Sequence, residues 1–110
     1  MPIALQLLKA IREIHARGIC HRDLKPDNII IDGDQVTLID FNVAVDVKLS
    51  EDGLIEGNTG LKEWSAPETR SNLKYDNQCD MWSVGCLLYF MYSGGENLFI
   101  MMSPNPEYIQ

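Results

Sequence analysis

The chain has 110 residues, of which 45% are hydrophobic, and its 16 acidic and 9 basic side chains give a formal net charge of -7. This length fits at most one small domain, and the hydrophobic content is that of a globular protein and not of a disordered one. Because its few Lys and Arg are scattered, the chain lacks the clustered positive charge that nucleic acids and anionic membranes require, so neither is an expected partner.

The first predicted element is an amphipathic helix over residues 3–17, where apolar residues recur at helical spacing and Gly18 follows as a stop signal. Two β-branched runs come next, at residues 28–31 and 36–39. They flank Asp32-Gly33-Asp34-Gln35, which has the composition of a hairpin connection. The sequence therefore predicts one helix followed by two short antiparallel strands.

Residues 45–60 are acidic, contain glycine and have no clear period, so we expect a long exposed loop. A second helix is predicted over residues 77–92, where apolar positions occupy most of the circumference before Ser93-Gly94-Gly95 ends it. Such a helix expects burial on nearly every side, yet the chain offers only one other convincing helix to cover it. The sequence thus predicts an α+β fold, mainly helical with a short hairpin, and it looks truncated.

The cysteines and the apolar runs bear on the compartment. Cys20, Cys79 and Cys86 form an odd number without C-x-x-C spacing, which signals neither a disulfide framework nor a zinc site. The first 18 residues mix charged and apolar side chains, so they contain no signal-peptide core, and no uncharged apolar run reaches membrane-spanning length. We expect an intracellular protein, and we favour the cytoplasm over the nucleus, although the sequence, which shows no basic targeting cluster, does not separate these two compartments.

One loop concentrates chemically active residues. The run His21-Arg22-Asp23-Leu24-Lys25-Pro26-Asp27-Asn28 lies between the first helix and the hairpin, and it resembles the catalytic loop of the protein kinases. Three further motifs follow in the order of that family: Asp40-Phe41-Asn42, Ala66-Pro67-Glu68 and Asp80-Met81-Trp82-Ser83-Val84-Gly85. The resemblance covers about residues 3–99 and implies that residues 1–110 are a partial large lobe, truncated at both ends and without the small lobe.

The resemblance implies phosphoryl transfer from Mg-ATP to a Ser or Thr hydroxyl of a protein substrate. Asp23 would orient the substrate hydroxyl, and Lys25 would bind ATP and neutralise charge on the transferred group. Asn28 and Asp40 would bind the nucleotide through Mg²⁺, for which amide and carboxylate oxygens are suitable ligands. Lys25 within this loop also indicates the Ser/Thr class. The plain alternative for each Asp or Asn is a turn former.

Regulatory and structural roles are implied in the same way. Arg22 would hold a phosphate on the activation loop, with Thr59 preferred over Ser50 as the acceptor; its plain alternative is a structural ion pair. His21 and Phe41 would join a buried spine. Asp80 would bind the backbone of the catalytic loop.

The sequence also departs from the family pattern. Asn42 stands where the family usually has Gly, at a position that could require a left-handed backbone. Leu61 stands where Ser/Thr kinases usually have Thr, and the sequence contains no G-x-G-x-x-G phosphate loop. We therefore expect the chain to be inactive alone. Two alternatives remain open: a non-catalytic, pseudokinase-like binding or scaffold protein, and a truncated gene product without activity.

Overall fold

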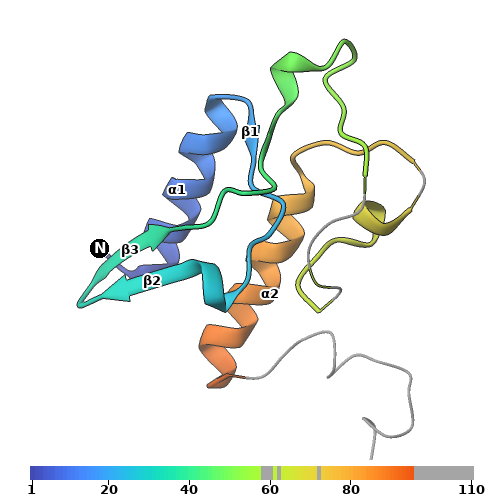
Figure 1. Ribbon diagram of the computed structural model, residues 1–110. Coiled ribbons are helices and arrows are strands. Elements are labelled where there is room, and N and C mark those ends of the chain that lie inside the picture. The colour runs from blue at the N-terminus through green and yellow to red at the C-terminus, as the bar shows by residue number, and fades with distance from the viewer. Residues whose placement is uncertain (58–60, 62, 72, 96–110) are drawn as a thin grey trace, which may run out of the picture.

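The computed structural model describes residues 1–57, 61, 63–71 and 73–95. The helices and strands are, in order, α1 (Ile3–Ala16), β1 (Ile19–Cys20), β2 (Ile29–Asp32), β3 (Gln35–Leu38), β4 (Val45–Asp46) and α2 (Cys79–Ser93), with 3-10 helices at Pro26–Asn28, Val47–Leu49 and Pro67–Arg70. The two α-helices lie side by side, and the β2–β3 hairpin projects beside α1 (Figure 1). The described part is thus α+β, but a mainly helical lobe is not confirmed.

Helix α1 follows the predicted span closely. It buries Leu7 and Ile11 on one face, at 1% exposure each, as the helical spacing predicted. It ends at Ala16, and Gly18 then takes a positive φ of 81°. A Cβ atom at Gly18 would lie only 2.8 Å from the Lys48 side chain, so this turn requires glycine both for its backbone angle and for the close approach. None of the described helices has the length and hydropathy needed to cross a bilayer.

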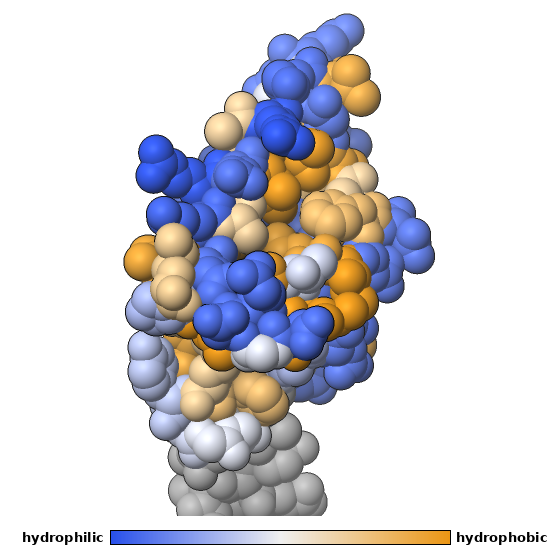
Figure 2. Space-filling view, turned by 90° about the vertical axis from the view of Figure 1, so that its left-hand side faces the viewer, coloured by the Kyte–Doolittle hydropathy of each residue, from blue (hydrophilic) through white to orange (hydrophobic). Residues whose placement is uncertain are grey.

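The predicted hairpin is confirmed, with a shorter turn than expected. Strands β2 and β3 pair antiparallel from Ile29 with Leu38 to Asp32 with Gln35, so only two residues connect them. Gly33 supplies the positive φ, 63°, that such tight turns need at their first central position. The Gln6 side chain of α1 holds the hairpin by accepting from the Val36 amide at 3.0 Å. The face of the molecule that carries α1 and the hairpin shows hydrophobic areas among hydrophilic ones (Figure 2).

The main core lies between the two helices. Its buried members are Leu7 and Ile11 of α1, Val84 and Leu87 of α2, and Leu24 from the connecting loop. The expectation that α2 would be covered on nearly every side is wrong for the described residues, because Met81 and Trp82 are 40% and 50% exposed. Helix α1 packs on one face of α2 only.

The predicted loop at 45–60 is partly structured. Strand β4 pairs antiparallel with β1, so Cys20 faces Val45, and Ile55 forms an isolated bridge with Tyr75. Apolar anchors explain the difference, since Ile55 is 4% exposed and packs with Tyr75 in a second small core. Residues 58–60, including the candidate Thr59, lie outside the described residues.

Candidate active site

The loop from His21 to Asn28 is anchored at its centre by an apolar side chain. Leu24 is 1% exposed and lies in the core between α1 and α2. Pro26 then starts a 3-10 turn, where its fixed φ suits the first helical position, and the Asn28 amide donates to the Lys25 carbonyl at 2.9 Å. The flanking residues Asp23 and Lys25 are therefore held on a fixed backbone.

Asp80 of α2 clamps the start of this loop, as predicted. Its carboxylate accepts from the backbone amides of His21, at 2.8 Å, and Arg22, at 3.0 Å, and it contacts His15 Nε2 at 2.9 Å. Burial alone would raise the pKa of Asp80, but the hydrogen bonds from His15 and the two amides outweigh it and lower that pKa. The clamp keeps Arg22 in a left-handed conformation, φ 71°, that non-glycine residues seldom adopt.

His21 links the loop to the segment that carries Asp40. Its ring is fully buried; Nδ1 accepts from the Asp23 amide at 3.1 Å, and Nε2 lies 3.0 Å from the Ile39 carbonyl. The backbone N–H of Asp23 can only donate and the carbonyl of Ile39 can only accept. The neutral His21 tautomer with its proton on Nε2 therefore satisfies both hydrogen bonds. Phe41 contacts the His21 ring with centroids 4.7 Å apart, but it is 42% exposed, so its expected burial is wrong.

Asp23, Asn28 and Lys25 converge. Asn28 is 4% exposed, and its Nδ2 donates to the Asp23 carbonyl at 2.7 Å and to the Asp23 carboxylate at 3.2 Å. Lys25 Nζ lies 3.9 Å from the other carboxylate oxygen. Both protons of the Asn28 amide are thus directed at Asp23, which orients its oxygen as the remaining acceptor.

Asp40 is brought to Asn28 through the backbone. The Ile39 amide, one residue earlier, donates to the Asn28 carbonyl at 3.0 Å. Asp40 itself is exposed, with φ 61°, and its carboxylate accepts from the Asn42 amide at 3.3 Å. Asn42 is not among the residues with positive φ, so the expectation of a left-handed backbone there is wrong. The left-handed residue is Asp40, and Asp tolerates that conformation well.

Arg22 binds two neutral groups. Its Nε donates to the Val43 carbonyl at 2.8 Å and its Nη1 to the Tyr75 hydroxyl at 3.1 Å. Tyr75 in turn donates to the Gly57 carbonyl at 2.7 Å. Among the described residues these partners are neutral, so they do not form the structural ion pair that was the plain alternative for Arg22. They tie the loop to the segment before the candidate Thr59.

The family assignment rests on a sequence comparison. The model of the protein kinase domain matches residues 2–107. The chain belongs to the protein kinase domain family. Similar kinases include a probable myosin light chain kinase of Dictyostelium discoideum, 38% identical over 96 residues, which are 84% of this chain and 30% of that protein.

Two further relatives carry kinase names. CBL-interacting serine/threonine-protein kinase 3 of Arabidopsis thaliana is 37% identical over 92 residues, and sperm motility kinase 2B of Mus musculus is 42% identical over 91 residues. These matches cover 81% of this chain in both cases, and 21% and 18% of the two relatives. The chain spans less than a third of the length of these curated kinases.

Two partners in this candidate site were missed from the sequence. His15 lies 65 residues from Asp80, and Tyr75 lies 53 residues from Arg22. No local pattern connects residues so far apart. The available signal for His15 was its position one turn after Ile11, on the buried side of α1.

Proposed function

We propose that this chain carries the catalytic residues of an ATP-dependent Ser/Thr protein kinase. The observation that carries the proposal is the convergence of Asp23, Lys25 and Asn28, with Asp40 joined to Asn28 through the Ile39 amide. A catalytic carboxylate, a cation and two oxygen ligands are the groups that phosphoryl transfer requires from this half of a kinase site.

The donor set fits Mg²⁺. Asn28 keeps its amide oxygen as an acceptor, and Asp40 has an exposed carboxylate; both are hard oxygen ligands. When bound, Mg-ATP would supply the phosphoryl group and neutralise part of its charge. These two residues would hold the metal.

Asp23 and Lys25 would act on the substrate and the transferred group. The Asn28 amide fixes one carboxylate oxygen of Asp23, so the carboxylate is oriented to accept the proton of an incoming Ser or Thr hydroxyl. Lys25 is about one-fifth exposed, at 22%, and its 3.9 Å distance to Asp23 leaves its ammonium able to contact a phosphate. We assign the protein an intracellular, cytoplasmic location and a protein substrate as part of the same proposal.

Arg22 would serve as a tether in this kinase. Its two neutral partners, Val43 and Tyr75, hold the segment after Asp40. A phosphate on Thr59 would compete for the same guanidinium, because a dianion is a stronger acceptor than a phenol.

The test is transfer of labelled phosphate from Mg-ATP to Ser/Thr peptides by the protein isolated from its own cells. We expect Asp23→Asn to reduce the rate by about 10²-fold or more. Asp40→Asn should weaken Mg-ADP binding, whereas Asp23→Asn should leave it nearly unchanged. Asp34→Asn, the same change at an exposed hairpin residue, is the matched control.

The outcomes separate the proposed function from its rival. Undiminished transfer by the Asp23→Asn protein would overturn the catalytic role. A folded protein that transfers no phosphate, yet binds a partner equally well with or without Asp23→Asn, would establish the non-catalytic scaffold instead.

A further inference from the structure

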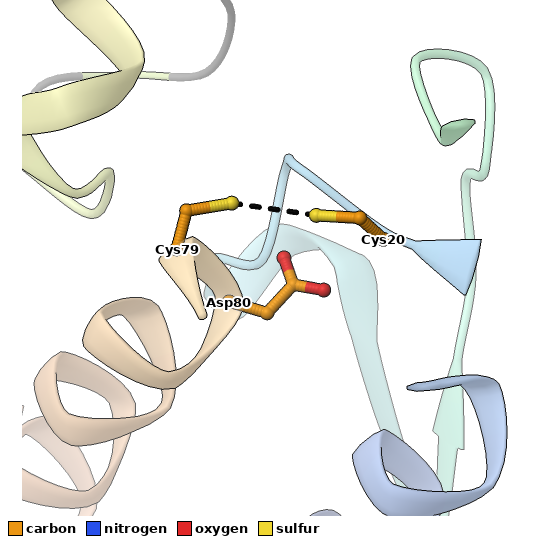
Figure 3. A group of neighbouring side chains, drawn as sticks. All are labelled: Cys20, Cys79 and Asp80. Carbon is orange, nitrogen blue, oxygen red and sulfur yellow. Dashed lines mark hydrogen bonds between the residues drawn. The ribbon is translucent and has the colours of Figure 1, made fainter. Parts of the chain in front are cut away.

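Two cysteines meet beside the Asp80 clamp. Cys20 is the last residue of β1 and directly precedes His21, while Cys79 is the first residue of α2 and directly precedes Asp80. Their sulfur atoms lie 3.3 Å apart, although the two residues are 59 positions apart in the chain. Both are buried, at 0% and 3% exposure. Figure 3 shows the two side chains pointing toward one another above the carboxylate of Asp80.

A metal ion is a poor occupant of this cluster. The ligand atoms of Cys20, Cys79 and Asp80 lie within 4.8 Å of one another, which is compatible with a shared ion. However, the Asp80 oxygens already accept from two backbone amides at 2.8 and 3.0 Å and contact His15 at 2.9 Å. Ligation would compete with these bonds, and two sulfurs alone do not complete the four-coordinate shell of zinc.

The geometry favours a covalent bond between the sulfurs. A disulfide has an S–S length of about 2.05 Å, so the observed pair has only a little more than 1 Å to close. The two sulfurs already face each other in a hydrogen bond. We propose that Cys20 and Cys79 form a site of reversible disulfide formation, with a peroxide as the oxidant.

The chemistry balances in two steps. The thiolate of one cysteine attacks an oxygen of hydrogen peroxide, breaks the O–O bond and becomes a sulfenic acid as one water leaves. The sulfur of the other cysteine then attacks the sulfenic sulfur, and the departing hydroxide takes the released proton to form a second water. Two thiols lose two electrons in total, and one peroxide molecule is reduced to two waters.

Burial sets the rate of this reaction and proximity sets its product. The hydrogen bond with Cys79 and desolvation raise the pKa of Cys20, so little thiolate is present at neutral pH. Oxidation is therefore slow and proceeds when the region opens locally. Once one sulfur is oxidised and the region closes, the facing sulfur is the nearest nucleophile.

The bond would reinforce the clamp. It would join the residue before His21 to the residue before Asp80, and so run parallel to the hydrogen bonds that hold the catalytic loop on α2. Because it closes a loop of 59 residues, it would also reduce the freedom of the unfolded chain. This inference does not depend on kinase activity.

The third cysteine provides an internal control. Cys86 is also buried, at 4% exposure, but it lies seven residues along α2 from Cys79, which corresponds to about 10 Å of helix. It is thus of the same type and burial without a facing thiol at bonding distance.

The experiment treats the full chain with hydrogen peroxide, then blocks free thiols, digests the chain and maps the peptides by mass spectrometry. We expect a loss of about 2 Da, a Cys20–Cys79 peptide pair and a free Cys86. The oxidised chain should melt roughly 10 °C higher or more, and dithiothreitol should reverse the shift. Cys86→Ser should behave like the unchanged chain, whereas Cys79→Ser should form no internal bond.

Three results would overturn the proposal: bonds that involve Cys86, dimers linked between chains, or overoxidised cysteines without any Cys20–Cys79 pair. The reaction is repeated with zinc chloride. Protection of both thiols by zinc would assign the pair to a metal instead. Peptide mapping of the unchanged chain decides these cases even if a variant fails to fold.

Discussion

The loop proposed to be catalytic, His21 to Asn28, and the segment from Asp46 to Gly57 both contact Tyr75, but different contacts hold them. The loop is fastened by the buried side chains of Leu24 and His21 and by the Asp80 carboxylate. The segment is attached by backbone pairing at its two ends, Asp46 with Ile19 and Ile55 with Tyr75. Its side chains add one buried anchor, Ile55, the bond from the Tyr75 hydroxyl to Gly57 and ion pairs on the surface.

This difference separates two tasks. Groups that perform chemistry need a fixed geometry, which burial and fully satisfied polar groups supply. A segment with mostly exposed side chains and a single buried anchor can be rearranged at lower cost, as regulation and substrate binding require. Each prediction below tests one side of the comparison.

The largest effect is expected for Asp80→Asn. The Asn side chain has one oxygen, whereas both carboxylate oxygens of Asp80 accept hydrogen bonds. It therefore cannot accept from the His21 and Arg22 backbone N–H groups and also from His15, so at least one buried donor loses its partner. We expect the free energy of unfolding to fall by about 3–5 kcal/mol, the usual cost of breaking a buried charged network. Urea unfolding followed by circular dichroism measures it. Asp34→Asn on the exposed turn should change little; equal losses in both variants would refute the clamp.

A matched pair of leucines compares the two regions directly. Leu24 of the loop is 1% exposed and Leu49 of the segment is 85% exposed. Leu24→Ala should lower the free energy of unfolding by about 2–5 kcal/mol through the cavity it leaves. Leu49→Ala should stay within about 0.5 kcal/mol of the unchanged chain. Urea unfolding measures both losses. Similar losses of unfolding free energy in Leu24→Ala and Leu49→Ala would show that the loop is not the better-anchored region.

Acid should weaken the loop clamp selectively. The pKa of Asp80 in the folded chain lies below its ordinary value of 3.8, so the unfolded chain takes up the proton first as the pH falls. The contribution of ionised Asp80 to the free energy of unfolding is complete above that ordinary value and disappears as the pH falls through the pKa of the folded chain. The stability difference between the unchanged chain and Asp80→Asn should therefore shrink below about pH 4. A constant difference down to about pH 2 would contradict the lowered pKa.

A smaller effect is expected where the segment meets the loop. Tyr75→Phe keeps the ring in its core but removes the bonds to Arg22 and Gly57. We expect a loss of about 1 kcal/mol and faster amide hydrogen exchange in residues 54–57, with the catalytic loop unchanged. Tyr92→Phe is the control, because Tyr92 is 81% exposed. Faster exchange throughout the catalytic loop would mean that the two regions are not separable.

The smallest effect on stability is expected from removing a surface ion pair. Lys74 contacts Asp52 at 2.7 Å and Glu56 at 3.6 Å, and its hydrogen bond lowers the pKa of the Asp52 carboxyl. Lys74→Met should return the Asp52 pKa upward toward its ordinary value, which an NMR titration can follow, while the urea midpoint stays unchanged. Lys9→Met on α1 serves as the charge-matched control. A clear shift in the midpoint would mean that this ion pair holds the segment.

Local patterns predicted the parts of this molecule that depend on neighbours in sequence. The helical spacing located all four ends of α1 and α2 to within two residues, and the β-branched runs located the hairpin. The order of four motifs indicated the kinase family. The roles of Asp23, Lys25, Asn28, Asp40, Arg22 and Thr59 remain predictions.

The missed features all depend on distant residues. The pairing of Cys20 with Val45 and the bridge from Ile55 to Tyr75 form only after the chain has folded back on itself, so no local period signals them. The exposure of Phe41 likewise depends on which elements pack over it, which a motif does not encode. Burial and pairing across the fold decide such positions more than propensity does.

The Asp80 clamp also limits how early the loop from His21 to Asn28 can fold while the chain is being translated. The carboxylate that shapes the backbone at His21 and Arg22 belongs to a residue translated 59 and 58 positions later. At about 5–20 residues per second, a ribosome needs roughly 3–12 s to cover that interval. During this time Leu24 has no α2 to pack against and Asp23 has no defined direction. The part of the site that is stiffest in the finished molecule therefore cannot take shape until Asp80 has been translated, and a chaperone that binds exposed apolar surface can act before then.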